Sequence, residues 1–251
     1  MVENYRIGVD VGGTFTDAII VNESSGEVHT GKISSTPSDP SVGFLELVHR
    51  MLTDVKVLPD SVKYVVHGTT VATNTIIQGR LAKTGFVTTD GFRDLLEIQT
   101  GIRPVLYDLQ FEKLPPLVPR HLCFGIVERL DARGDVLEPL DENSVRSVGE
   151  KLRYEGVESV AVCLLHSYVN PKHENRTKDI LSKILPGVVI SISSDIAPEF
   201  REYFRASTTV INAGVSPVVG QYLQSIQSRL RDFGLSAELL VMQSGGGVLT
   251  F

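Results

Sequence analysis

The most informative stretch of this 251-residue chain is Val9-Asp10-Val11-Gly12-Gly13-Thr14-Phe15-Thr16-Asp17. Apolar residues alternate with other residues up to Val11, which is the period-two pattern of a β-strand, and the strand carries Asp10 near its end. The two glycines permit positive or otherwise unusual φ angles, so the backbone turns there. From Phe15 to Val21 the pattern indicates a second strand. The stretch therefore predicts a strand, a turn and a strand.

The turn has the chemistry of a phosphate-binding loop. Consecutive N–H groups in such a turn converge on an anion, and the hydroxyls of Thr14 and Thr16 add donors. Asp10 would hold Mg²⁺, directly or through a bound water, beside the phosphates. Walker and dinucleotide-binding loops open a helix, and the chain contains neither GxxxxGK[ST] nor GxGxxG. A tight hairpin turn with a solvated Asp10 is the alternative interpretation.

A second stretch, Val66-His67-Gly68-Thr69-Thr70-Val71-Ala72-Thr73-Asn74, also follows a strand. It leads into a helix predicted over residues 70–78, which places the N–H groups of Thr69 and Thr70 at a helix N-terminus. Such an end binds anions or polarises a carbonyl group. Two structural interpretations remain open, in which Thr69 or Thr70 is a helix cap and His67 is a packing residue.

The rest of the chain alternates between strand and helix patterns. Strands are predicted over residues 7–11, 15–21 and 28–33 as a meander, and over 62–66, 85–88, 160–165, 188–193 and 238–242. Helices are predicted after the Asp39 cap with Pro40, over 90–98 with Asp90 as cap, and over 142–154, 171–185 and 199–233, the last broken near 214–217. A hairpin is expected between 124–130 and 136–140, and irregular chain over 101–119.

These elements predict an α/β fold, an RNase H-like domain of the actin, sugar-kinase and heat-shock ATPase type. We expect a mixed sheet with flanking helices and an N-terminal β-hairpin phosphate loop. A domain boundary is expected near Pro186, giving an N-terminal domain over 1–186 and the start of a second domain over 187–251. The last predicted strand runs into a glycine loop and the chain stops at Phe251, so we expect a truncated second domain.

Composition excludes several classes of function. The chain has 24 Lys+Arg, 30 Asp+Glu and a formal net charge of −6, which disfavours nucleic-acid and anionic-membrane partners. Its 42% hydrophobic and 22% charged residues are typical of a globular protein. Apolar stretches fall far short of the roughly 18 residues of a membrane span, and no signal peptide is visible. Two distant cysteines without a CxxC pattern are typical of a reducing cytoplasm, where we expect the protein.

The remaining polar groups are expected to be structural. His166, His173 and Glu174 do not have the spacing of a helical metal-binding pair, and Cys163 lies in an apolar strand. A solvated face with local ion pairs is predicted for Arg201, Glu202 and Arg205, and cap and first-turn positions for Asp90 and Asp94.

Three stretches together resemble the hydantoinase A / 5-oxoprolinase family, namely 10–17, 67–74 and the segment Thr88-Thr89-Asp90-Gly91-Phe92-Arg93-Asp94-Leu95-Leu96-Glu97-Ile98. Further matches are Arg103-Pro104, Tyr107-Asp108-Leu109, Pro116-Leu117-Val118-Pro119-Arg120, His166-Ser167-Tyr168, Asn170-Pro171, His173-Glu174, Arg201-Glu202-Tyr203, Arg205, Ser207-Thr208-Thr209-Val210, Asn212-Ala213 and Met242-Gln243-Ser244. They occur in the family's order, so the resemblance covers essentially the whole chain.

The resemblance implies a hydrolase that uses ATP to phosphorylate the amide oxygen of 5-oxoproline or a hydantoin, which makes the ring a better electrophile for water. The implied cofactors are ATP and Mg²⁺. By position, the first phosphate loop is Asp10, Gly12, Gly13, Thr14, Phe15 and Thr16, with Asp10 organising Mg²⁺. The turn with His67, Gly68, Thr69, Thr70 and Asn74 would lie near the terminal phosphate or the substrate.

Two departures from the family pattern matter. Gly245 stands where the family commonly has Asn, and the second phosphate loop and the adenosine pocket lie beyond the length of this chain. We therefore expect no turnover by this chain alone and a requirement for the remaining half of the enzyme or a second subunit. A subunit of an ATP-dependent, acetone-type carboxylase and a non-catalytic split module are the alternative hypotheses.

Overall fold

The computed structural model describes residues 4–36, 39–102, 105, 107–108 and 110–250. They form two compact units: the first comprises Met1–Ile77 with Val219–Phe251, and the second is Gln78–Val218. The predicted α/β class is confirmed. Arg103, Pro104 and Leu109, which contributed to the resemblance, lie outside the described residues.

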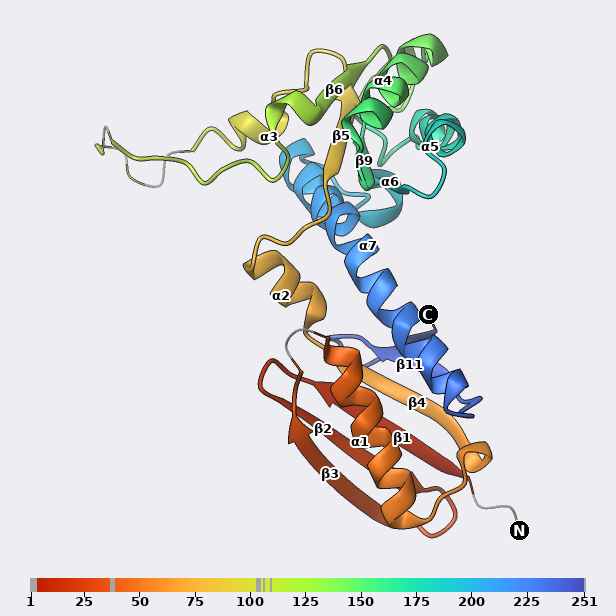
Figure 1. Ribbon diagram of the computed structural model, residues 1–251. Coiled ribbons are helices and arrows are strands. Elements are labelled where there is room, and N and C mark those ends of the chain that lie inside the picture. The colour runs from red at the N-terminus through yellow and green to blue at the C-terminus, as the bar shows by residue number, and fades with distance from the viewer. Residues whose placement is uncertain (1–3, 37–38, 103–104, 106, 109, 251) are drawn as a thin grey trace. The chain divides into compact units, whose positions relative to one another are not determined.

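A six-stranded mixed sheet forms the first unit, in the order β12-β11-β4-β1-β2-β3. Its strands are β1 (Tyr5–Val11), β2 (Phe15–Asn22), β3 (Val28–Ser34), β4 (Val62–Thr69), β11 (Glu238–Met242) and β12 (Val248–Thr250). The first three strands form the predicted antiparallel meander, whereas β1, β4 and β11 are parallel neighbours (Figure 1).

The core of the first unit lies on one face of this sheet. Helix α1 (Pro40–Val55) covers that face and begins as predicted, because the Asp39 side chain accepts the Ser41 N–H (Figure 1). Ile7 and other alternate strand residues pack there against Phe44 of α1 and against Ile226 in the last part of α7 (Glu202–Asp232). A short helix, α2 (Val71–Ile77), follows β4.

The second unit contains a four-stranded sheet that is entirely parallel, in the order β10-β9-β5-β6. Its strands are β5 (Thr84–Thr89), β6 (Cys123–Ile126), β9 (Ser159–Cys163) and β10 (Val189–Ile192), with a separate hairpin of β7 (Arg129–Leu130) and β8 (Val136–Glu138). Its helices are α3 (Leu95–Ile98), α4 (Glu142–Glu155), α5 (Lys172–Ile184), α6 (Ser193–Ile196) and the first part of α7. Single 3₁₀ turns span Pro59–Ser61 in the first unit and Arg120–Leu122 in the second.

Both faces of the second unit's sheet are covered. Every residue of β5 and β9 is buried. Neighbouring strand residues point to opposite faces, and Thr84 lies against Gly214 of α7 whereas Gly85 lies against Leu152 of α4. Cys163 is buried in this core, as predicted.

Three predicted elements differ in the structure. Residues 90–94 are not helical, because Asp90 donates its N–H to Ile126 and the chain turns at Gly91, where φ is 85°. The predicted hairpin is restricted to β7 and β8, because Cys123–Ile126 instead pairs in parallel with β5. The break near 214–217 is wrong: α7 continues through Pro217, and the nearby Gly214 carbonyl accepts the Ala82 N–H.

Residues 101–119 contain no helix or strand among those described, in line with the prediction. No helix in the described ranges has the length and apolar character needed to cross a membrane.

Candidate phosphate-binding site

The turn between β1 and β2 is built by a small set of backbone and hydroxyl contacts. The Gly12 N–H donates to the Phe15 carbonyl at 3.0 Å and closes the hairpin. Ser35, just after β3, donates its hydroxyl to the Gly12 carbonyl at 2.8 Å and its N–H to the Thr14 carbonyl at 2.9 Å. These bonds hold the turn's carbonyl groups toward the end of β3.

The N–H groups of Gly13 and Thr14 have no acceptor among the described residues, and both residues are exposed. Two adjacent free donors are the feature that an anion-binding turn requires. Of the positive or otherwise unusual φ angles that the two glycines permit, a positive φ is found at neither Gly12 nor Gly13. Glycine is needed at position 12 for space instead, because a Cβ there would lie 3.0 Å from the Phe15 carbonyl oxygen.

The two threonines of the turn differ in their surroundings. Thr14 is exposed, and its hydroxyl is available to a ligand. Thr16 is fully buried, with its Oγ1 3.0 Å from the Ser35 hydroxyl oxygen. Thr16 therefore stabilises the turn from its buried side, through the Ser35 hydroxyl. Phe15 is 46% exposed, and the Lys32 ammonium lies 4.7 Å from the centre of its ring.

Asp10 lies on the sheet face opposite to the core, in register with Asp17 of β2 and Gly68 of β4. A Cβ at position 68 would lie 3.0 Å from the Asp10 Oδ1, so glycine leaves room for this carboxylate over β4. A depression of about 350 Å³ adjoins it, with Gly8 and Ile19 among its lining residues. The close approach of this carboxylate explains why position 68 is a glycine.

His67 points the other way, into the core. Its Nδ1 lies 3.3 Å from the Val9 carbonyl oxygen and its Nε2 3.0 Å from the Tyr222 hydroxyl, and its ring packs edge-on against Phe44. Burial lowers the pKa of His67 to about 4, so the ring is neutral. Since a carbonyl only accepts, Nδ1 carries the proton and Nε2 accepts from Tyr222, whose own pKa burial raises to about 12.

The remaining residues of the second motif shape the start of α2. The Thr69 hydroxyl accepts the Val71 N–H at 3.2 Å, so Thr69 has the cap-like role of the structural interpretation. Asn74 donates its side-chain amide to the Thr70 hydroxyl at 3.2 Å. The structure brings Gly68 next to Asp10 and directs His67 away from it.

The carboxylates near the turn fit a magnesium ion that is bound mainly by phosphate and water. No group of three His, Cys, Asp or Glu residues within the described ranges is arranged to hold a metal. Mg²⁺ beside phosphates commonly takes only one or two protein carboxylates and keeps several waters. Asp10 meets that need, while Asp17 is paired with Lys32 at 2.8 Å. Ser35 was missed by sequence reasoning, because a lone serine after a strand carries no signal.

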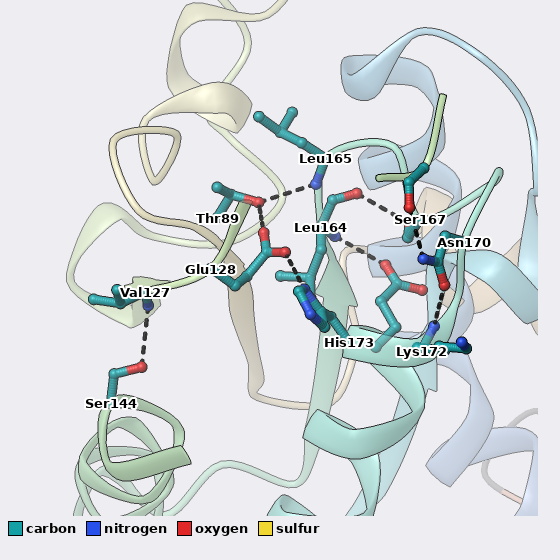
Figure 2. Close-up of polar contacts among 12 residues, drawn as sticks. Thr89, Val127, Glu128, Ser144, Leu164, Leu165, Ser167, Asn170, Lys172 and His173 are labelled. Carbon is teal, nitrogen blue, oxygen red and sulfur yellow. Dashed lines mark hydrogen bonds and ion pairs between the residues drawn. The ribbon is translucent and has the colours of Figure 1, made fainter. Parts of the chain in front are cut away.

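A second polar cluster lies at the carboxyl ends of β5, β6 and β9 in the second unit (Figure 2). The Glu128 side chain is fully buried and receives hydrogen bonds from the Thr89 hydroxyl and, at 2.8 Å, from the His173 Nδ1. The Leu165 N–H donates to the same Thr89 oxygen at 3.0 Å. These bonds tie the ends of the strands to the start of α5.

Two buried charges continue this network. Glu174 accepts from the Leu164 N–H and the Ser193 hydroxyl, and Arg205 donates to the Ser167 hydroxyl and the Leu164 carbonyl. The prediction of a solvated face is wrong for Arg205, which is 2% exposed.

The assignment of Arg201 to the helix is also wrong. Arg201 precedes α7 and has a φ of 86°.

The chain matches two family models. The model described as the hydantoinase/oxoprolinase N-terminal region covers residues 6–185, and the model described as hydantoinase/oxoprolinase covers residues 205–251. Among curated relatives, an uncharacterized protein of Methanocaldococcus jannaschii is 39% identical over 99% of this chain and 36% of its own length. The caprolactamase subunit alpha of Pseudomonas jessenii is 35% identical over 98% of this chain and 36% of its own length.

Two solved structures have the same fold. The ATP-dependent caprolactamase from Pseudomonas jessenii aligns with a TM-score of 0.87 and 34% identity over 97% of this chain and 36% of that one. Nucleotide-free acetone carboxylase aligns with a TM-score of 0.84 and 28% identity over 99% and 37%. The chain thus spans little more than a third of the length of these relatives. Because the model of the N-terminal region matches residues 6–185, which is more than half of the chain, the chain belongs to the hydantoinase/oxoprolinase family.

Proposed function

We propose that this chain supplies the first phosphate-binding hairpin of an ATP-dependent enzyme that opens a cyclic amide. The substrate class is a 5-oxoproline or hydantoin ring, activated by phosphorylation of its amide oxygen. The observation that carries this proposal is the pair of free N–H donors at Gly13 and Thr14, next to the Asp10 carboxylate.

Each group at the turn has a role in holding nucleotide. The N–H groups of Gly13 and Thr14 and the Thr14 hydroxyl would bind oxygens of the β- and γ-phosphates. Asp10 would hold Mg²⁺ directly or through water, and the ion would neutralise phosphate charge. Ser35 and Thr16 keep the turn in shape from the buried side. The Gly68 position leaves the carboxylate free to rotate toward the ligand.

The complete enzyme would need a further part. We propose that residues 1–186 act as the N-terminal domain and 187–251 as the beginning of a second, and that the rest of the enzyme, as one polypeptide or another subunit, completes the nucleotide site. Relatives that carry the name subunit support this. The free cysteines Cys123 and Cys163 accord with a reducing cytoplasm as the site of action.

The decisive measurement is isothermal titration of the purified chain with Mg·ATP and, in parallel, Mg·ADP. We expect micromolar binding that Asp10→Asn weakens at least about 100-fold, because the amide keeps the shape and loses the charge. Asp54→Asn, at an exposed position of α1, is the matched control and should bind as the unaltered chain does. Equal binding by the Asp10 and Asp54 variants would exclude the hairpin as the phosphate site.

A second candidate is a nucleotide-using subunit of an ATP-dependent carboxylase, and the structural similarity to acetone carboxylase, with a TM-score of 0.84, supports it. The two candidates differ in what stimulates ATP hydrolysis by the complete assembly. Stimulation by a lactam or hydantoin supports the hydrolase, and stimulation that needs both a ketone and bicarbonate supports the carboxylase. Nucleotide-independent association with a partner would support a non-catalytic module.

A further inference from the structure

A hollow of about 660 Å³ lies within the second unit, between the end of α3, the segment 111–117 and the first turns of α7. Figure 1 shows α3 beside the start of α7. Every residue that lines the hollow belongs to the second unit, and none belongs to the phosphate turn. Pockets for small organic molecules commonly have volumes of about 300 to 1,000 Å³, so the hollow has the size of a ligand site.

The wall of the hollow is mostly apolar. Leu96 is buried, whereas Leu114 on the opposite segment is 84% exposed. Helix α7 contributes Tyr203, Ser207 and Ile211, which share one face because they are four positions apart, and all three are half-buried. An apolar body would lie against these side chains and remove them from water.

The polar groups of the hollow are hydrogen-bond donors. Lys113 donates to the Glu97 carbonyl at 3.3 Å, which leaves two of its N–H groups free. The Gln99 side-chain amide and the Tyr203 hydroxyl have no hydrogen-bond partner among the described residues. No Asp or Glu is among the described residues that line the hollow. One ammonium group and two neutral donors, without an acid, are complementary to a single negative charge.

The backbone at Gln99 is strained. Its φ is 59° and its ψ is −137°, a combination that glycine adopts freely and other residues rarely do. Such residues cost about 1 to 3 kcal/mol and are concentrated at ligand sites. A glycine at position 99 would avoid this cost, so the strain indicates that the glutamine side chain is needed at the wall of the hollow.

We propose that this hollow binds an apolar monocarboxylate, a small molecule with one carboxylate head on a hydrocarbon chain or ring system. The carboxylate would accept hydrogen bonds from Lys113, Gln99 and Tyr203, and the hydrocarbon body would lie on the apolar wall. This binding site goes beyond the proposed function and does not depend on nucleotide.

Isothermal titration of the purified chain with decanoate tests the proposal. We expect saturable binding of one decanoate per chain. Hexanoate should bind at least about tenfold more weakly, because it lacks four of the methylene groups that would lie on the wall. Decylamine has the same hydrocarbon body and the opposite charge, so its affinity should also be at least about tenfold lower.

Two variants separate the head group's contacts from the apolar wall. Lys113→Met keeps an apolar stem and removes the charge, so it should weaken decanoate binding at least about tenfold. Lys183→Met, at an exposed position in the last turn of α5, is the matched control and should bind as the unaltered chain does. Gln99→Gly should weaken binding about fivefold and leave the unfolding temperature unchanged or higher, because it removes a donor and relieves the strain. A residue that only shapes the loop would not weaken binding without a loss of stability.

The proposal is overturned if decanoate shows no saturable binding, or if Lys113→Met binds decanoate like Lys183→Met. Equal binding of decanoate and decylamine would also overturn it, because the hollow would then recognise apolar surface alone, as a docking site for another polypeptide does. The Asp10→Asn variant separates this site from the nucleotide site: it should bind decanoate normally while losing Mg·ATP binding.

Discussion

In each sheet an aspartate near the carboxyl end of a strand, Asp10 in β1 and Asp90 just after β5, lies against a glycine of the neighbouring parallel strand. In the first unit Asp10 faces Gly68, and in the second Asp90 faces Gly125, where an added Cβ would lie 3.0 and 2.7 Å from the respective Oδ1 atoms. The surroundings differ. The Asp90 N–H is bonded to the Ile126 carbonyl, whereas the turn after Asp10 presents two free N–H groups.

The same contrast extends to the side chains nearby. In the second unit the carboxyl ends of the strands are closed by internal bonds from Thr89, Glu128, His173 and Glu174. In the first unit the strand ends lead to an exposed turn and to the depression of about 350 Å³ beside Asp10. A similar aspartate–glycine contact thus lies beside internally hydrogen-bonded strand ends in the second unit and beside unpaired N–H groups in the first. The unsatisfied donors, more than the aspartate, mark the candidate site.

The largest expected effect tests how far the second unit depends on its internal bonds. Glu174→Ala removes the acceptor of the Leu164 and Ser194 N–H groups and of the Ser193 hydroxyl. Because these donors are left unpaired beside buried Arg205, we expect a loss of about 4 kcal/mol in the free energy of unfolding. Urea denaturation followed by circular dichroism measures it. Glu150→Ala, on the exposed side of α4, is the control, and a similar small loss for both variants would refute the argument.

The next effect is specific to the first unit and depends on pH. Burial lowers the pKa of His67 to about 4, so between pH 6.5 and 4 the unfolded chain binds a proton that the folded chain does not. Stability is therefore full above pH 6.5 and falls as the pH drops toward 4, by about 3 kcal/mol in all. Urea midpoints at several pH values should lose most of this slope in His67→Gln. Tyr222→Phe leaves the His67 ring buried, so the pH dependence of stability should remain. A pH dependence that is unchanged in both variants would contradict its assignment to His67.

A matched pair of glycine substitutions compares the two strand ends directly. At Gly125 a Cβ would lie 2.9 Å from the Asp90 Cα, which is backbone, so Gly125→Ala should cost about 2 kcal/mol. At Gly68 the close contact is only the Asp10 side chain, so Gly68→Ala should cost less than about 1 kcal/mol. The Gly68 variant would instead displace the carboxylate and weaken Mg·ATP binding about tenfold, or about 1.4 kcal/mol. Denaturation and titration measure the two effects, and equal stability losses would count against the comparison.

The sequence predicted what depends on neighbouring residues. The hairpin at Gly12, the meander and the Asp39 cap follow from patterns within a few positions, and the structure has them. That the His67 side chain points into the core could also have been predicted, because Val65 and His67 lie on the same, buried side of β4.

What depends on distant partners was not predictable. Arg205 looks like a surface residue beside Glu202, yet its partners Ser167 and Leu164 lie 38 and 41 positions away. Asp90 resembled a helix cap, but β6, which pairs with its strand, supplies the acceptor for its N–H. Ser35 acquires its role in the turn only once β3 lies beside β2.

The smallest expected effect compares one helix cap from each unit. Among the residues that the structure describes, the Asp141 side chain accepts only the Asn143 N–H of α4, so Asp141→Ala should cost about 1 kcal/mol. Asp39 accepts both the N–H and the hydroxyl of Ser41 and pairs with Arg229 at 3.1 Å, so Asp39→Ala should cost about 1.5 kcal/mol. The Ser41 hydroxyl holds the pKa of Asp39 below its ordinary value, so this contribution is present at neutral pH and is lost as the pH falls through that lowered pKa. Asp39→Ser, which keeps the cap and removes the charge, should recover most of the loss in urea denaturation. A Ser variant as unstable as the Ala variant would assign the effect to Arg229 rather than to the cap.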